Sequence, residues 1–188
     1  MYTHNLDPVL LSLGFLEVRW YSLAYIFGII IGWWLGKKII VKRFDKIGQK
    51  FNLIEFDNLI TYLIISMILG GRVGYIFFYN IEYYISNPID IFKIWEGGMS
   101  FHGALIGGTI AMYVFAKKKN YEFLRITDWV SPQLPIALFL GRIANFINSE
   151  LVGKTTDVFW GVIFPKIDDK LRHPSQLYEA LLEGLILF

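Results

Sequence analysis

Four polar residues lie close together at the end of an apolar, membrane-length segment of the sequence. They are Arg142, Asn145, Asn148 and Glu150. Ionisable residues at membrane depth cost several kcal/mol unless they are paired, face a cavity or line a pathway, so by default they predict a functional site. A guanidinium donates two parallel hydrogen bonds to an oxyanion and stays charged at any relevant pH. We therefore expect Arg142 to bind a phosphate, and the headgroup of an anionic lipid is the natural ligand.

His102 is a second residue whose type suits chemistry. The reference pKa of histidine, near 6.5, lies close to working pH, so His102 is a candidate general base. The alternative is a packing residue that donates a hydrogen bond between helices. The glycines around it favour close helix contact, because Gly103 and Gly107, like Gly70 and Gly74, have small-xxx-small spacing. We expect this glycine pattern to serve helix packing.

The composition indicates what kind of element must position these residues. The chain is 55% hydrophobic and 18% aromatic, with a mean hydropathy of +0.46, which predicts a polytopic membrane protein. It has no cysteine, which excludes disulfides, thiolate metal sites and a cysteine nucleophile in this chain. A net charge of +2 is too small to predict a nucleic-acid partner, and we expect no cofactor or metal. No signal peptide is recognisable, so the chain is expected to begin near Met1.

Apolar runs of about 20 residues predict an all-α polytopic integral membrane protein with four complete transmembrane helices and the start of a fifth. The predicted helices are Trp20–Val41, Leu59–Tyr79, Met99–Ala116, Trp129–Asn148 and a fifth from Ser175. The fifth stops at Phe188 within an apolar run, so we expect the chain to be a fragment. We expect one membrane domain, 1–188, made of an interfacial segment 1–18, four helices in 19–150, a small extramembrane head segment 151–174 and the start of the fifth helix in 175–188.

Basic residues predict the orientation of these helices. They gather in the first loop and the third loop, at Lys37, Lys38, Lys42, Arg43, Lys46 and Lys50 and at Lys117, Lys118, Lys119 and Arg125. By the positive-inside rule both loops are cytoplasmic and the N-terminus is outside. The second loop supports this with Lys93 as its only basic residue, whereas the head segment carries four and weakens the contrast.

The orientation predicts one layer of polar side chains. Arg72 and Arg142 each lie 13 residues beyond the cytoplasmic start of their helix, which is about 20 Å at 1.5 Å per residue. His102, Tyr21 and Tyr25 lie near the outer ends of theirs. We therefore expect these side chains to share a layer in the outer half of the bilayer. The alternative for each arginine is snorkelling or a structural bond to backbone carbonyls.

The run from Gly141 to Gly153 resembles the signature of the bacterial prolipoprotein diacylglyceryl transferase family, G-R-x-[GA]-N-F-x-N-x-E-x-x-G, at every fixed position. Four other stretches resemble the same family in the same order. They are Trp20-Tyr21, the runs from Gly70 to Tyr75 and from Trp95 to Gly103, and the run from Arg172 to Glu179. Together these motifs extend over the chain.

The resemblance implies a transferase of the bacterial cytoplasmic (inner) membrane, multi-pass, with its active site toward the outer leaflet. The family moves the diacylglyceryl group of phosphatidylglycerol to the thiol of the lipobox cysteine of a preprolipoprotein, forming a thioether and releasing glycerol phosphate. The expected partners are phosphatidylglycerol, the lipobox peptide and the lipid bilayer. Matched positions give His102 and Arg142 as catalytic residues, and Arg142, Asn145, Glu150, Gly153, Tyr21 and Arg72 as substrate-binding residues.

The reaction explains these residue types. Sulfur must attack as thiolate, whereas a free thiol with a pKa near 8.5 is mostly protonated at neutral pH. His102 is the candidate base, and the cationic Arg142 and Arg72 would favour thiolate and hold the departing phosphate. Glu150 is expected to pair with an arginine or to orient the site rather than act as the base. Gly153 is expected to permit a tight exit into the head segment.

The run from Arg172 to Glu179 is expected to set geometry at the membrane interface. Pro174 stops a regular helix start and Ser175 caps the fifth helix. Tyr178 and Glu179 are then expected to face the substrate site from the first turn of the fifth helix.

The sequence departs from the family at two places. Ala104 stands where the family usually has a second glycine after the histidine. The family also has further spanning helices, one with another essential arginine, which this chain lacks, so the 188-residue piece need not be active. A non-enzymatic anionic-lipid or anion transporter is the alternative function, but no pair of interrupted helices marks inverted repeats. An intramembrane protease lacks support, because neither Gly-x-Ser-Gly nor His-Glu-x-x-His occurs.

Overall fold

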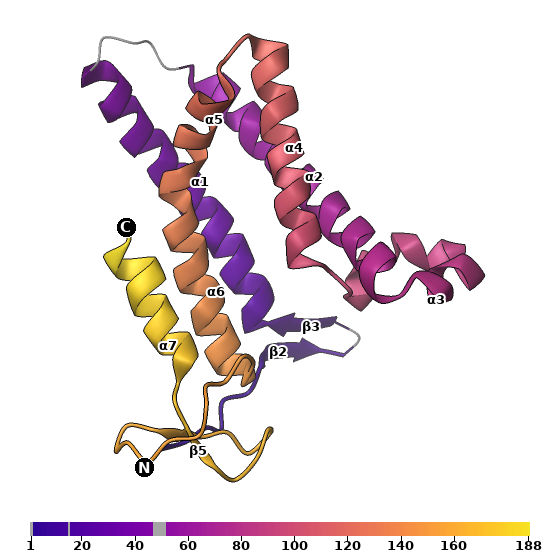
Figure 1. Cartoon of the computed structure of the whole chain (residues 1–188), viewed down its shortest axis with the longest axis vertical. Coiled ribbons are helices and arrows are strands. Elements are labelled where there is room, and N and C mark those ends of the chain that lie inside the picture. The colour runs from indigo at the N-terminus through magenta and orange to yellow at the C-terminus, as the bar shows by residue number, and fades with distance from the viewer. Residues whose placement is uncertain (1, 15, 47–51) are drawn as a thin grey trace. The chain divides into compact units, whose positions relative to one another are not determined.

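The computed structural model describes residues 2–14, 16–46 and 52–188, which form two compact units. The first unit comprises the residues up to Ile39 together with Val130–Phe188, and the second is Ile40–Trp129. Figure 1 shows the helices and strands of each unit. The basic residues expected in the first loop include Arg43 and Lys46, whose side chains lie outside the described residues, and Lys50, which lies wholly outside them.

The described chain is mostly helical. Its α-helices are α1 (Trp20–Lys46), α2 (Leu53–Tyr79), α3 (Ile81–Ser86), α4 (Phe101–Lys119), α5 (Phe123–Val130), α6 (Leu134–Asn148) and α7 (Ser175–Glu179). Short 3-10 turns occupy Pro88–Phe92, Ile94–Glu96 and Ser131–Gln133, and α7 continues as a π-helix over Ala180–Ile186. The strands are β1 (Tyr2–Thr3), β2 (Val9–Leu13), β3 (Leu16–Arg19), β4 (Val162–Ile163) and β5 (Leu171–Arg172). The prediction of an all-α protein is therefore correct for the long elements, but it missed these five short strands.

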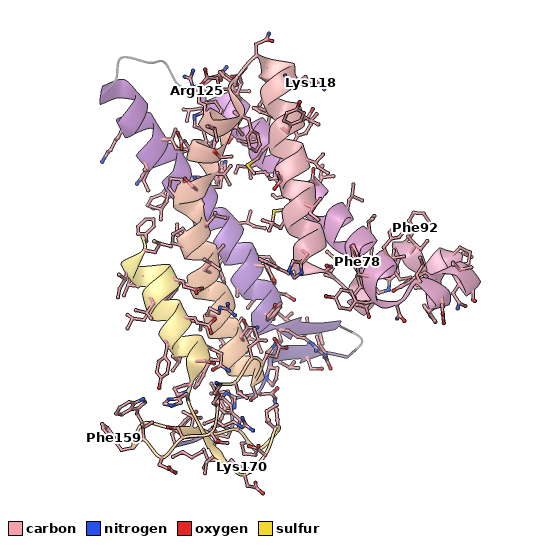
Figure 2. All side chains as sticks on the ribbon, in the orientation of Figure 1. Phe78, Phe92, Lys118, Arg125, Phe159 and Lys170 are labelled. Carbon is pink, nitrogen blue, oxygen red and sulfur yellow. The ribbon has the colours of Figure 1, made fainter. Side chains whose placement is uncertain are left out.

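Three helical segments of the described chain are long and apolar enough to cross a membrane. They are Trp20–Ile40, Leu53–Tyr79 and Phe123–Asn148. Large apolar side chains remain exposed beside them, and Figure 2 shows Phe78 and Phe92 projecting from the ribbon of the second unit with 77% and 76% of their surfaces exposed. Such surfaces suit contact with lipid. The chain is a polytopic membrane protein, while a fourth complete span and the orientation stay predictions.

The remaining predicted span, Met99–Ala116, forms helix α4, which is not among these three segments. It is 19 residues long and its last turn holds Lys117, Lys118 and Lys119. In the second unit α4 packs closely on α2 through glycines. A Cβ on Gly74 would lie 2.8 Å from the Cα of Gly103, and one on Gly107 would lie 3.2 Å from the Cα of Gly70. The predicted small-xxx-small packing is confirmed.

Two of the predicted helix boundaries are corrected. Helix α2 begins at Leu53 rather than Leu59, because the Asn52 side chain accepts hydrogen bonds from the amides of Ile54 and Glu55, at 3.0 and 3.4 Å. The predicted fourth helix starts earlier too and is interrupted. A 3-10 turn containing Pro132 separates α5 from α6, since proline removes a backbone donor and disfavours a regular helix before it.

In the first unit α6 contacts both α1 and the last helical segment. A Cβ on Gly28 of α1 would lie 3.8 Å from the Cα of Ala137. A Cβ on Gly184 would meet the Cα of Phe139 at 2.9 Å, so the segment after α7 approaches the backbone of α6 closely. Glycine is required only at position 184, because a Cβ at Gly28 would make an ordinary van der Waals contact.

The predicted interfacial and head segments contain the strands. Strand β1 pairs in parallel with β4, and β4 pairs antiparallel with β5, so the N-terminus adds a strand to the head segment 151–174. Strands β2 and β3 form an antiparallel hairpin that Gly14, with φ of 73°, helps to reverse. The position of the N-terminal segment at a membrane interface stays a prediction.

Candidate active site

The polar end of α6 finishes in a strained turn. The amide of Glu150 donates to the carbonyl of Asn145 at 2.9 Å, and the amide of Ser149 donates to that of Phe146 at 3.1 Å, which is a Schellman arrangement. Ser149 has φ of 60° and Leu151 has φ of 51°. Each costs roughly 1 kcal/mol or more for a residue with a Cβ, and such strain gathers at functional sites. We call Ser149–Leu151 the signature turn.

The signature turn points the Glu150 carboxylate back at α6. It accepts hydrogen bonds from Nδ2 of Asn145 at 2.9 Å and Nδ2 of Asn148 at 3.2 Å. Asn145 is buried, with 8% of its surface exposed. The expected arginine partner of Glu150 is therefore corrected, because the carboxylate is bound to two amide groups. The other expectation, that Glu150 orients the site, stays a prediction.

Arg142 has a different acid as its partner. Its Nη2 lies 2.7 Å from Oε2 of Glu179 on α7, and both side chains are partly exposed. The Nε of Arg142 is buried and has no hydrogen-bond partner among the described residues. A charged guanidinium with one acidic partner and an unused buried donor retains capacity to bind an oxyanion.

The start of α7 fastens the signature turn. The Ser175 hydroxyl donates to the carbonyl of Leu151 at 2.9 Å, and Nε2 of the fully buried Gln176 donates to the carbonyl of Glu150. The expected N-cap role of Ser175 is wrong, because Pro174 occupies the N-cap position and the helix has no side-chain cap. The Ser175 hydroxyl is used to hold the turn instead.

Tyr21 and Tyr25 lie on successive turns of α1. Their hydroxyl oxygens are 3.2 Å apart and their ring centroids are 5.1 Å apart. Helix α1 thus places two phenol hydroxyl groups side by side within the first unit.

Gly153 makes a close backbone contact in the head segment. Its amide donates to the carbonyl of His173 at 3.0 Å, and a Cβ would lie 2.5 Å from that same oxygen. Its own carbonyl accepts from Nη1 of Arg172 at 3.0 Å. This close approach is a packing reason for glycine here, and a contact of Gly153 with substrate stays a prediction.

Other polar side chains of the head segment are engaged with one another. Arg172 binds Asp168 with two hydrogen bonds, and this pairing lowers the pKa of the Asp168 carboxyl and raises the pKa of the guanidinium. The Tyr178 hydroxyl lies 2.6 Å from Nε1 of Trp160 and 3.1 Å from Nδ1 of His173. The sequence indicated neither Asp168 nor Trp160.

In the second unit, Arg72 is buried among backbone carbonyls. Its five N–H groups are all used in hydrogen bonds, to the carbonyls of Asp90, Ile91, Lys93, Gly97 and Gly98. A guanidinium has five N–H donors, so none remains for a phosphate. These contacts favour the alternative expected for this arginine, a structural bond to backbone carbonyls, over a phosphate contact. This arginine fixes the segment that precedes α4.

That segment leads directly to His102. The amide of Ser100 donates to the carbonyl of Gly71 at 2.8 Å, and the Ser100 hydroxyl caps α4 by accepting from the amide of Gly103 at 3.2 Å. His102 lies in the first turn of α4, is exposed, and has no hydrogen bond to another described residue. This exposure favours an accessible base over a packing donor.

The predicted site residues thus fall in both units. Tyr21, Arg142, Asn145, Glu150 and Gly153 belong to the first, and Arg72 and His102 belong to the second. The expectation that all of them share one layer stays a prediction.

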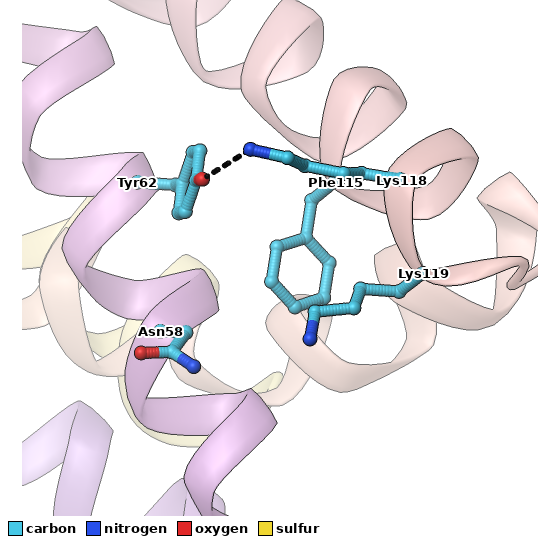
Figure 3. Close-up of a pocket in the computed structure, with 5 residues that line it drawn as sticks. All are labelled: Asn58, Tyr62, Phe115, Lys118 and Lys119. Carbon is cyan, nitrogen blue, oxygen red and sulfur yellow. Dashed lines mark hydrogen bonds between the residues drawn. The ribbon is translucent and has the colours of Figure 1, made fainter.

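A pocket of about 450 Å³ lies in the second unit between α2 and α4, lined by Asn58, Tyr62, Phe115, Lys118 and Lys119 (Figure 3). It contains none of the predicted site residues. Nζ of Lys118 donates to the Tyr62 hydroxyl at 3.3 Å, and Nζ of Lys119 lies 3.5 Å from the Glu55 carboxylate. Both lysines are therefore engaged. Within the described ranges, no three histidine or acidic side chains are grouped to hold a metal ion.

The model of the prolipoprotein diacylglyceryl transferase family matches residues 8–188. A protein of Rickettsia rickettsii (strain Sheila Smith) is 54% identical over 98% of this chain and 70% of its own length. One of Rickettsia bellii (strain OSU 85-389) is 55% identical, and one of Nitratidesulfovibrio vulgaris (strain DP4) is 49% identical, each over 98% of this chain and 68% of its own length. All three are named phosphatidylglycerol--prolipoprotein diacylglyceryl transferase.

Proposed function

The chain belongs to the prolipoprotein diacylglyceryl transferase family, and on this premise we propose that it lipidates preprolipoproteins at the lipobox cysteine. The donor is phosphatidylglycerol. The cysteine sulfur attacks the glycerol carbon that bears the phosphate, a C–S bond forms and the C–O bond breaks. The electron pair of that C–O bond leaves with glycerol phosphate, and the thiol proton passes to a base.

The surroundings of Arg142 give the main structural support for this proposed function. Its Nη2 is held by Glu179 at 2.7 Å while its buried Nε has no partner among the described residues. A guanidinium fixed on one edge presents its remaining donors in a defined direction, which suits the phosphate on which charge develops as the C–O bond breaks. Arg142 is therefore the residue that holds the phosphate of the donor lipid.

Asn145 and Glu150 orient the lipid beside Arg142. One N–H of the Asn145 amide is bound to Glu150 at 2.9 Å, which fixes the amide plane and leaves its second N–H to donate to an ester or phosphate oxygen. Tyr21 belongs to the same unit and adds a hydroxyl group from α1. Gly153 allows the chain to turn tightly from the end of α6 into the head segment. These proposed roles rest on contacts within this chain as well as on the positions that match the family.

His102 receives the thiol proton. Its imidazole is exposed in the first turn of α4 and makes no hydrogen bond within the described chain, so a substrate thiol has access to it. Arg72 acts on the reaction through His102, because it holds the segment that leads into α4. We thus assign Arg72 a positioning role in place of a phosphate contact.

The protein works in the bacterial cytoplasmic (inner) membrane as one multi-pass domain, with the N-terminus outside and four complete spans followed by a fifth helix. The three lysines that end α4 support a cytoplasmic location for that end. The active site then opens to the outer leaflet, where phosphatidylglycerol and the lipobox peptide meet.

The test uses the protein expressed from its whole reading frame and reconstituted in vesicles. A lipobox peptide is added, and diacylglyceryl adduct is measured by mass spectrometry. Adduct is expected with phosphatidylglycerol vesicles, and none with phosphatidylcholine vesicles or with a peptide whose cysteine is replaced by serine. A wild-type protein that forms no adduct, or forms it equally from phosphatidylcholine, would contradict the proposed function.

A further inference from the structure

His4 is a buried histidine that the reaction scheme leaves unused. Only 4% of its surface is exposed. Its ring lies against Phe146 edge-on, with centroids 5.1 Å apart, and against Phe164 at 5.3 Å. Its backbone amide donates to the carbonyl of Ile163 at 2.8 Å. His4 therefore joins the N-terminal segment, the head segment and the end of α6, all within the first unit.

The imidazole of His4 makes one side-chain hydrogen bond, and it goes to the signature turn. Nδ1 lies 3.1 Å from the hydroxyl oxygen of Ser149, and that serine is 3% exposed. Nε2 is buried and has no partner among the described residues. The only side-chain partner of this ring among the described residues is thus Ser149, and the ring also interacts with the backbone of Phe146 on α6.

Ser149 is the residue whose conformation sets the turn. It has φ of 60° in a position that glycine usually fills, so contacts outside the helix must hold it there. The next residue, Glu150, owes the direction of its carboxylate to this reversal. That carboxylate in turn fixes the amide of Asn145 at 2.9 Å.

We propose that His4 is a positioning residue for lipid transfer: through Ser149 it holds the signature turn and so aligns Glu150 and Asn145 with Arg142. This role rests on the proposed transferase function. It also makes a prediction about the protein alone, namely that the turn loosens when the His4–Ser149 bond is removed.

Two substitutions of His4 separate hydrogen bonding from packing. His4→Phe keeps a ring between Phe146 and Phe164 but has no group to bond Ser149. His4→Asn loses the ring but carries an amide near the place of Nδ1, and an amide offers both a donor and an acceptor. Ser149→Ala removes the bond from the other side.

The experiment compares His4→Phe, His4→Asn, Ser149→Ala and the double variant His4→Phe/Ser149→Ala in phosphatidylglycerol vesicles, each expressed from the whole reading frame. Two quantities are measured: kcat/KM for adduct formation per folded protein, and amide hydrogen exchange of residues 147–153. We expect His4→Phe and Ser149→Ala each to lower kcat/KM about tenfold, the size of one lost hydrogen bond, and to speed exchange of the turn. The double variant should equal either single one, and His4→Asn should recover most of the wild-type value.

Equal losses in His4→Asn and His4→Phe, or single effects that multiply in the double variant, would overturn the proposal. So would unchanged exchange of residues 147–153 in both His4→Phe and Ser149→Ala. If the wild-type protein forms no adduct, the proposed function fails, and hydrogen exchange still decides whether His4 holds the turn.

Discussion

Two arginines that the sequence predicts at the same depth have opposite surroundings. Arg72 is 5% exposed and donates all five of its N–H groups to backbone carbonyls of residues 90–98. Arg142 has one acidic partner, Glu179, and a buried Nε without a partner in the described chain. The first guanidinium is saturated by its own protein, and the second retains capacity for a ligand.

Predicted depth in a membrane therefore identifies residues that are costly to bury, but it does not distinguish a ligand-binding residue from a structural one. Both arginines satisfy the expectation that a buried charge must be paired or hydrogen-bonded. The count of unused donors separates them, because a phosphate needs donors that the protein has left available. The comparison therefore favours a binding role for Arg142 and a structural role for Arg72.

The largest expected effect is on the reaction. Arg142→Ala should lower kcat/KM for adduct formation about a thousandfold, because a single charged or dipolar group facing the developing charge contributes about 10²–10³ in rate. Lipobox peptide and mass spectrometry provide the measurement in phosphatidylglycerol vesicles. Undiminished adduct would contradict the assignment of Arg142.

The next effect is on stability. Arg72→Met should destabilise the protein by about 3 kcal/mol or more, because the buried carbonyls that it satisfies are left without donors. Thermal unfolding in detergent measures this, with Arg142→Met as the matched control. If Arg142→Met lowers the unfolding temperature as much as Arg72→Met does, the contrast between the two arginines fails.

A smaller effect is expected at the partner of Arg142. Glu179→Gln keeps the shape of the side chain but removes the charge that orients the guanidinium, so kcat/KM should fall about tenfold, as for the loss of one charge-assisted hydrogen bond. Glu183→Gln, an exposed position one turn further on, is the control and should leave the rate unchanged. Equal kcat/KM in the two variants would contradict a role for Glu179 in orienting Arg142.

The smallest effect concerns pH and the signature turn. Burial lowers the pKa of His4 below its ordinary value of 6.5, the charge of Lys166 lowers it further, and hydrogen bonding with the backbone of Phe146 acts in the opposite direction. The folded protein then binds fewer protons than the unfolded chain. The contribution of neutral His4 to the free energy of unfolding is therefore fully present above about pH 6.5. It is lost as the pH falls below that value, by at most about 1.4 kcal/mol per pH unit.

Thermal unfolding at pH 7.5 and pH 5.5 checks this dependence. Wild type should lose more stability on acidification than His4→Asn, in which the titrating group is absent. The same loss in both proteins would show that other groups account for it.

The local part of the fold follows from sequence patterns. The start of α1 at Trp20, the end of α2 at Tyr79 and the glycine contacts between α2 and α4 depend on apolar length and residue size, which the sequence displays directly. The polar run at the end of α6 was also identifiable, because polar side chains interrupt an apolar segment.

The partners of these residues were not predictable in the same way. Glu179 reaches Arg142 because α7 starts beside the end of α6, and that depends on tertiary packing. The acceptors of Arg72 are backbone carbonyls of an irregular segment, which have no side-chain pattern. His4 lies 145 positions from Ser149, just after strand β1 and between the polar residues Thr3 and Asn5, so no spacing rule connects it with Ser149.

The binding of the released product tests the role of Arg142 most directly. Glycerol phosphate is titrated into the purified protein, expressed from its whole reading frame, in detergent, and its Kd is measured for wild type and for Arg142→Lys. We expect a Kd at least about tenfold higher in Arg142→Lys, because an ammonium cannot reproduce the planar pair of hydrogen bonds. An unchanged Kd would show that the phosphate is held elsewhere and would contradict the account.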